Sequence, residues 1–69
     1  MVEVFKTNVE GGELAEQLVS TLLGEFPRCK INFDLDDCDR ILRVEGRQVC
    51  PESIVDWMKA HGYFCEVLN

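Results

Sequence analysis

Apolar residues in this chain follow two different spacings, and the order in which these spacings alternate limits the possible folds. Residues 2–6 alternate between apolar and polar side chains, which is typical of a half-buried strand. From Glu13 onward the apolar residues recur three and four positions apart, which predicts a helix that Gly24 and Pro27 end. Each change of spacing therefore marks a change in the type of element.

The second part of the chain predicts a hairpin followed by a helix and a final strand. Residues 29–35 alternate, the polar run 36–39 predicts the hairpin turn, and residues 41–45 return as the second strand. With that turn, Phe33 faces Leu42 and Ile31 faces Val44, so the apolar side chains share one face. A helix then begins at Pro51 and ends near residues 61 and 62, and residues 63–68 form the last strand.

The resulting order, βαββαβ, predicts an α+β fold of the ferredoxin-like kind. Two right-handed strand–helix–strand units place both helices on one face of a four-stranded antiparallel sheet, giving a two-layer sandwich with the expected strand order 4-1-3-2. The 69 residues make one domain, 1–69. Three loops should then meet at one end of the sheet, here called the loop end: the loop before the first helix, the hairpin turn and the loop after the second helix.

The net negative charge of the chain argues against some classes of binding partner. Thirteen acidic and seven basic side chains give a net charge of −6, which repels nucleic acid and anionic lipid. No segment approaches the roughly 20 apolar residues of a membrane span, and the N-terminus has no basic region leading into an apolar run. We therefore expect a cytoplasmic protein that binds neither nucleic acid nor membrane.

The four cysteines, at positions 29, 38, 50 and 65, form no CxxC, CxC or CxxH motif. In a reducing compartment we expect thiols that fill the core as small apolar side chains. Cys29 and Cys50 are the pair expected to approach each other, as a weak soft-metal site or as a disulfide under oxidation. Cys50 also precedes the helix that begins at Pro51, and a helix N-terminus favours the thiolate. It is therefore the best candidate for a thiol redox function.

Three segments resemble heavy-metal-associated domains: residues 5–9 (Phe-Lys-Thr-Asn-Val) their first strand, residues 40–46 their third strand, and residues 54–63 their second helix with its Gly-Tyr ending. The resemblance covers nearly the whole chain and implies the ferredoxin-like fold. In that family a loop cysteine and a second cysteine three residues later hold a soft ion such as Cu(I) or Zn(II). This chain has Gly11 and Leu14 at those positions, so we expect neither the family's metal site nor a cofactor.

The leading hypothesis is therefore a non-catalytic protein-binding or regulatory module, for which the resemblance implies a metal-homeostasis context. Its partner would be an unidentified protein. The protein itself is expected to be a monomer or a weak homodimer, the latter because exposed sheet edges can pair with each other. An acidic surface suits a basic partner. The candidate contact residues share the loop end and are Glu10, Gly11, Gly12, Glu13, Asp36, Asp37 and Tyr63.

Two alternatives remain open. One is soft-metal binding or transport that uses atypical ligands among the four cysteines and the loop-end carboxylates; the other is the thiol redox function at Cys50. We do not expect an enzyme, because no nucleophile or carboxylate is placed by spacing near His61, the single histidine. His61 is predicted to be an exposed residue at a helix end, and Trp57 to be partly buried.

Overall fold

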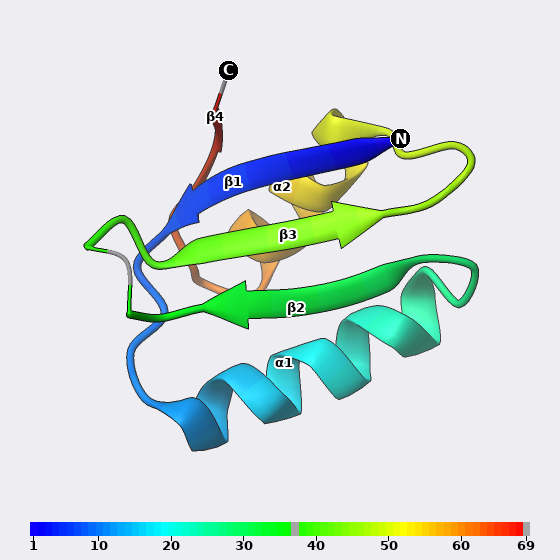
Figure 1. Ribbon diagram of the computed structural model, residues 1–69. Helices are drawn as coiled ribbons and strands as arrows, with labels where there is room; N and C mark the ends of the chain where they lie inside the picture. Colours follow the sequence, from blue (N-terminus) through cyan, green and yellow to red (C-terminus); the bar gives the residue numbers. More distant parts are fainter. Residues whose placement is uncertain (37, 69) are drawn as a thin grey trace.

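The computed structural model describes residues 1–36 and 38–68, and its elements follow the predicted order (Figure 1). These elements are β1 (Val2–Thr7), α1 (Gly12–Glu25), β2 (Lys30–Asp34), β3 (Ile41–Glu45), α2 (Pro51–Ala60) and β4 (Cys65–Leu68). The prediction that the last strand begins at residue 63 is wrong by two residues. Gly62 has a positive φ of 87°, and Tyr63 N donates to Met58 O at 2.9 Å, so both residues form the cap that follows α2.

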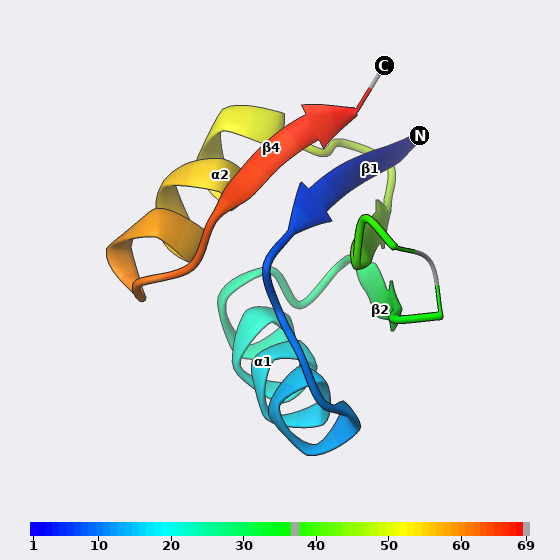
Figure 2. The same cartoon turned by 90° about the vertical axis from the view of Figure 1, so that its left-hand side faces the viewer.

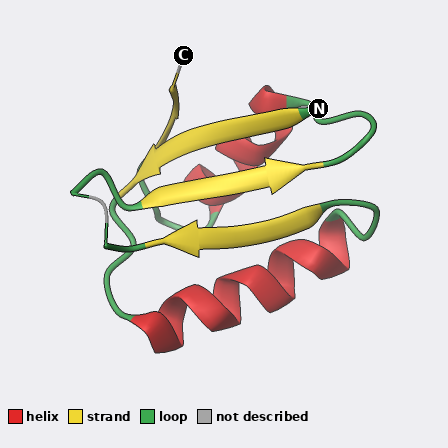
Figure 3. Ribbon diagram, viewed as in Figure 1, coloured by secondary structure: helices red, strands yellow, loops and turns green. Residues whose placement is uncertain are grey.

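The four strands form one antiparallel sheet in the order β2-β3-β1-β4, which is 4-1-3-2 when read from the other edge (Figure 3). The hairpin register pairs Ile31 with Val44 and Phe33 with Leu42, which confirms the pairing predicted from the sequence. Strand β1 lies in the interior of the sheet between β3 and β4. Strands β2 and β4 are therefore the two edges.

Both helices lie on the same side of the sheet, with α1 next to β2 and α2 next to β4 (Figure 2). The core between the two layers contains Phe5 and Leu42 from the sheet, Leu22 from α1 and Met58 from α2, none of which is exposed to solvent. This two-layer α+β arrangement is compatible with a ferredoxin-like fold. Within residues 1–36 and 38–68, neither helix is long and apolar enough to cross a membrane.

The C-terminal end of α2 confirms both predictions for its ring side chains. Trp57 is half-buried and packs against the core, and His61 is exposed. The two rings stack with their centroids 3.8 Å apart, and His61 Nδ1 lies 2.8 Å from Trp57 O. The imidazole is thus engaged in closing the helix.

Thr7 is a buried polar residue that links the end of β1 to two other segments. Its Oγ1 donates a hydrogen bond to Arg40 O at 2.7 Å and accepts one from Val9 N at 3.2 Å. Its backbone N donates to Asp39 O at 3.1 Å. One side chain therefore holds together β1, the loop before α1 and the β2–β3 turn.

Replacing Thr7 with valine should lower the free energy of unfolding by about 1–3 kcal/mol, because Arg40 O and Val9 N lose a buried partner. Urea denaturation measures this change. Thr21→Val is the matched control, since the Thr21 hydroxyl donates to Gln17 O on an exposed face of α1. The control should change stability by less than about 0.5 kcal/mol. A loss at Thr7 no larger than that at Thr21 would contradict the role of the buried hydroxyl.

Candidate functional site

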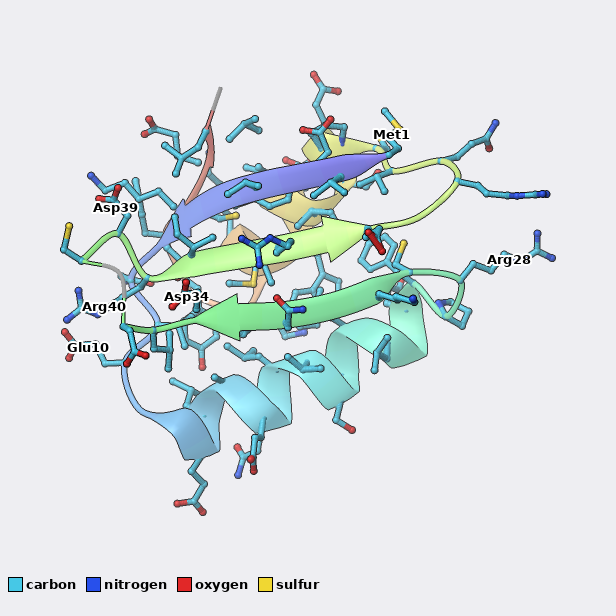
Figure 4. All side chains as sticks on the ribbon, in the orientation of Figure 1. Met1, Glu10, Arg28, Asp34, Asp39 and Arg40 are labelled. Atoms are coloured by element: carbon cyan, nitrogen blue, oxygen red, sulfur yellow. The ribbon has the colours of Figure 1, made fainter. Side chains whose placement is uncertain are left out.

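The three loops meet at the loop end, as the fold prediction requires. Asn8 Oδ1 accepts a hydrogen bond from Phe64 N at 3.0 Å, which ties the loop before α1 to the loop before β4. Arg40 Nη2 lies 2.8 Å from Glu10 Oε1, which ties the same loop to the β2–β3 turn. Figure 4 shows Glu10, Arg40, Asp39 and Asp34 at this end and Met1 and Arg28 at the other. The loop end is thus held together by side-chain contacts between all three segments.

Arg40 is a residue that the sequence analysis missed. It has a φ of 46°, a left-handed conformation that a residue other than glycine seldom adopts. Its carbonyl accepts from Thr7, and its guanidinium contacts Glu10 Oε1 and Cys38 O. The polar run 36–39 predicts a turn but gives no sign of which residue takes the positive φ.

The structure brings only some of the predicted contact residues together. Five of them are exposed at the loop end, and Tyr63 is half-buried: the exposed residues are Glu10, Gly11, Gly12, Glu13 and Asp36. Glu10 is engaged by Arg40. Gly12 and Asp36 line a common groove. Asp37 lies outside the described residues.

This groove lies between α1 and the edge strand β2 and has a volume of about 740 Å³. Its apolar lining comes from both elements: Ala15 and Val19 of α1, and Ile31, Phe33 and Leu35 in and after β2. Glu16, Asp34 and Asp36 supply carboxylates, and Arg43 supplies one guanidinium. Sequence reasoning did not find the groove, because Val19, Phe33 and Leu35 follow the spacing of ordinary core residues yet remain half-buried.

The two positions at which the sequence resemblance would place metal ligands carry no donor atom for a soft ion. Gly11 is exposed and has a φ of 90°. Leu14 is half-buried and packs against the core. Elsewhere in residues 1–36 and 38–68, no three side chains of histidine, cysteine, aspartate or glutamate gather as a metal site would require.

The prediction that all four cysteines are buried as small apolar side chains of the core is wrong for three of them. All four are free thiols, and only Cys65 is buried, where desolvation raises its pKa to about 11. Cys38 and Cys50 are exposed, because one lies in the β2–β3 turn and the other precedes α2. Cys29 is half-buried and packs beside Gly46, where an added Cβ atom would lie 3.1 Å from its Sγ.

Cys50 occupies the N-cap position of α2. The pKa of the Cys50 thiol lies below its ordinary value, chiefly because the nearby Ser53 hydroxyl, and next the Ser53 backbone, favour the thiolate. This thiol is therefore exposed, contrary to the expectation of burial, and its lowered pKa agrees with the direction that its place before Pro51 predicts.

Comparisons with family models, curated proteins and solved structures found no match. The similarity of three segments to heavy-metal-associated domains stays a prediction. The residues and their geometry are the basis for the functional proposal that follows.

Ser53→Ala should slow the alkylation of Cys50 by iodoacetamide near neutral pH and shift the midpoint of its pH–rate profile upward. The lowered pKa means that the thiolate is present at a lower pH than usual, and the variant loses the largest cause of that shift. Mass spectrometry of the alkylated peptides measures each thiol separately, so Cys38 serves as an exposed internal control. An unchanged Cys50 profile in the variant would contradict the role of Ser53.

Proposed function

We propose that this protein is a non-catalytic relative of heavy-metal-associated domains, with a ferredoxin-like fold, that binds a protein partner. The loop end and the adjoining groove are the proposed contact surface. The observation that carries the proposal is a preformed acidic end: Thr7, Asn8 and Arg40 fix three loops by hydrogen bonds and an ion pair, while carboxylates beside them stay exposed.

The relation to heavy-metal-associated domains is supported by the order of the elements, the strand order and the position of both helices on one side of the sheet. The proposed loss of the family's metal chemistry is supported by Gly11 and Leu14. Glycine offers no side-chain ligand, and Leu14 packs against the apolar core. A soft ion requires thiolate, imidazole or thioether donors at such a place.

Protein binding is supported by the composition of the surface. Protein interfaces combine an apolar centre with a polar rim and a preorganised backbone. Here the groove supplies half-buried Val19, Phe33 and Leu35, and carboxylates surround them. The contacts of Thr7 and Asn8 hold the neighbouring loops, so a partner would not have to order them.

Double reversal of charge, Glu13→Lys with Asp36→Lys, should abolish capture of the partner from extracts of the source cells without unfolding the domain. These two residues are chosen because Glu10 is already paired with Arg40. Glu25→Lys with Glu45→Lys makes the same change of charge at exposed positions of α1 and β3 and should retain capture. Quantitative mass spectrometry of the captured proteins, with thermal unfolding as a check, measures the result. Equal capture by both variants would remove the loop end as the contact surface.

The second candidate is a thiol function at Cys50. It is favoured by one observation, the exposed sulfur at the N-cap of α2 with its lowered pKa. A redox protein of this kind requires a partner thiol or disulfide, and the same charge reversals at the loop end should leave its thiol exchange unchanged. A function lost in Cys50→Ser and kept in the loop-end variant would support this candidate over protein binding.

Titration of the fully reduced protein with Cu(I) and Zn(II), against a competing chelator, tests the soft-metal alternative. We expect no site that competes at one equivalent, because neither Gly11 nor Leu14 can coordinate an ion. Replacing all four cysteines with alanine gives the background for adventitious thiol binding. Stoichiometric binding that this variant loses would return metal transport as the leading function.

A further inference from the structure

We infer that the groove between α1 and β2 receives an extended, basic segment of a protein partner, which pairs with β2 as a fifth strand of the sheet. The inference rests on the proposed protein-binding function and adds the class of partner and the mode of binding. Three features support it: the free edge of β2, the groove beside that edge and the charge around the groove.

Within residues 1–36 and 38–68, strand β2 pairs with β3 alone, so one of its sides has no strand partner there. None of residues 30–34 takes part in the backbone hydrogen bonds that these residues form outside the helices and the sheet. An edge strand directs alternate backbone N–H and C=O groups away from the sheet, where an added strand can bind them. The strand contains no proline that would block such pairing.

The groove gives an added strand a place for its side chains. Helix α1 runs alongside β2 (Figure 1), and the groove follows this junction. Side chains along a strand alternate between its two faces. One set would therefore contact the half-buried Val19, Phe33 and Leu35, and the other would lie over Asn32 and Arg43 on the open face of the sheet. The occupant should accordingly be apolar at every second position.

The acidic charge around the groove favours basic residues at the alternate, non-apolar positions of the bound segment. Glu16, Asp34 and Asp36 line it, against the single guanidinium of Arg43. Within residues 1–36 and 38–68, no lysine or arginine forms an ion pair with any of these three carboxylates. They are free to attract lysine or arginine side chains of a partner. A second copy of this chain is a poorer occupant, since each copy carries a net charge of −6.

The opposite edge offers a matched control surface. The groove between α2 and β4 is also lined by carboxylates, from Glu52, Asp56 and Glu66, but its volume is about 500 Å³ and β4 has only four residues. The groove at β4 is therefore acidic, like the groove at β2, but it is smaller and lies beside a shorter strand. Charge reversal there separates a general electrostatic effect from binding at β2.

The probe is a capped nonapeptide that alternates lysine and valine, added to the full chain and followed by amide NMR. Saturable one-to-one binding should shift the amide signals of residues 30–36 and 12–19 and slow hydrogen exchange in β2. The same peptide with N-methyl groups on alternate backbone nitrogens keeps its charge but cannot pair as a strand, so it should not bind. A glutamate–valine peptide should not bind either.

Two double variants complete the test. Glu16→Lys with Asp34→Lys should weaken binding of the lysine–valine peptide by about tenfold or more, whereas Glu52→Lys with Asp56→Lys should leave it unchanged. All four positions are exposed, so both variants should keep the wild-type melting temperature.

Several results would overturn the inference. They are equal binding of the N-methylated peptide, shifts centred on β4, an absence of saturable binding at millimolar peptide, or a peptide-free dimer with protected β2 amides. The last result would assign the edge to a second copy. If Glu13→Lys with Asp36→Lys abolishes partner capture while the peptide fails to bind, the proposed protein binding is supported and the proposed strand addition at β2 is wrong. If the peptide binds at β2 while both capture variants retain the partner, the edge of β2 accepts an extended segment, but Glu13 and Asp36 are not part of the partner's contact surface.

Discussion

The hydroxyl of Thr7 is the contact on which the arrangement of the loop end depends. It accepts from Val9 N and donates to Arg40 O, so the start of the first loop and the end of the hairpin turn share one buried atom. Arg40 thereby keeps a left-handed φ of 46° and directs its guanidinium to Glu10. The loop that Glu10 belongs to leads directly into α1, and the position of α1 beside β2 creates the groove. A single threonine at the end of an interior strand thus influences a surface formed by other elements.

The hairpin register was predictable from the sequence, and the start of the last strand was not. A slip of one residue would turn every side chain of β2 to the opposite face, so Ile31 and Phe33 must face Val44 and Leu42 if the apolar residues are to share the core. At Tyr63 no such rule applies. Its apolar character suits a strand, but its backbone N–H binds Met58 O and so caps the end of α2. Local hydrogen bonding of this kind has no signature in residue spacing.

Some features of the candidate site were likewise predictable from the sequence, and others were not. The meeting of three loops follows from the order of the elements, and exposure of Glu13 and Asp36 follows from their place in it. The groove depends instead on how closely α1 packs against the edge of the sheet, a tertiary distance that a chain of periodic apolar residues does not encode. Val19 and Phe33 therefore have the sequence spacing of core residues, but in the structure they are only half-buried and line the groove. The exposure of Cys38 and Cys50 has a similar origin, because both lie in connections that the apolar pattern does not describe.

Acidic residues near the loop end serve two physically different purposes. Glu10 is neutralised by Arg40, and Asp39 lies 3.6 Å from Lys6 Nζ, so these carboxylates help to hold the turn and the first loop in place. Glu16, Asp34 and Asp36 have no such counterion among the described residues and border the groove. Exposed charges of this kind act over about 10 Å at moderate ionic strength, and their effect falls as salt rises. Strand pairing and apolar contact, by contrast, act at short range and resist salt. The carboxylates would therefore favour a basic segment and raise its association rate. Strand pairing at the edge of β2 and apolar contacts in the groove would lower its dissociation rate.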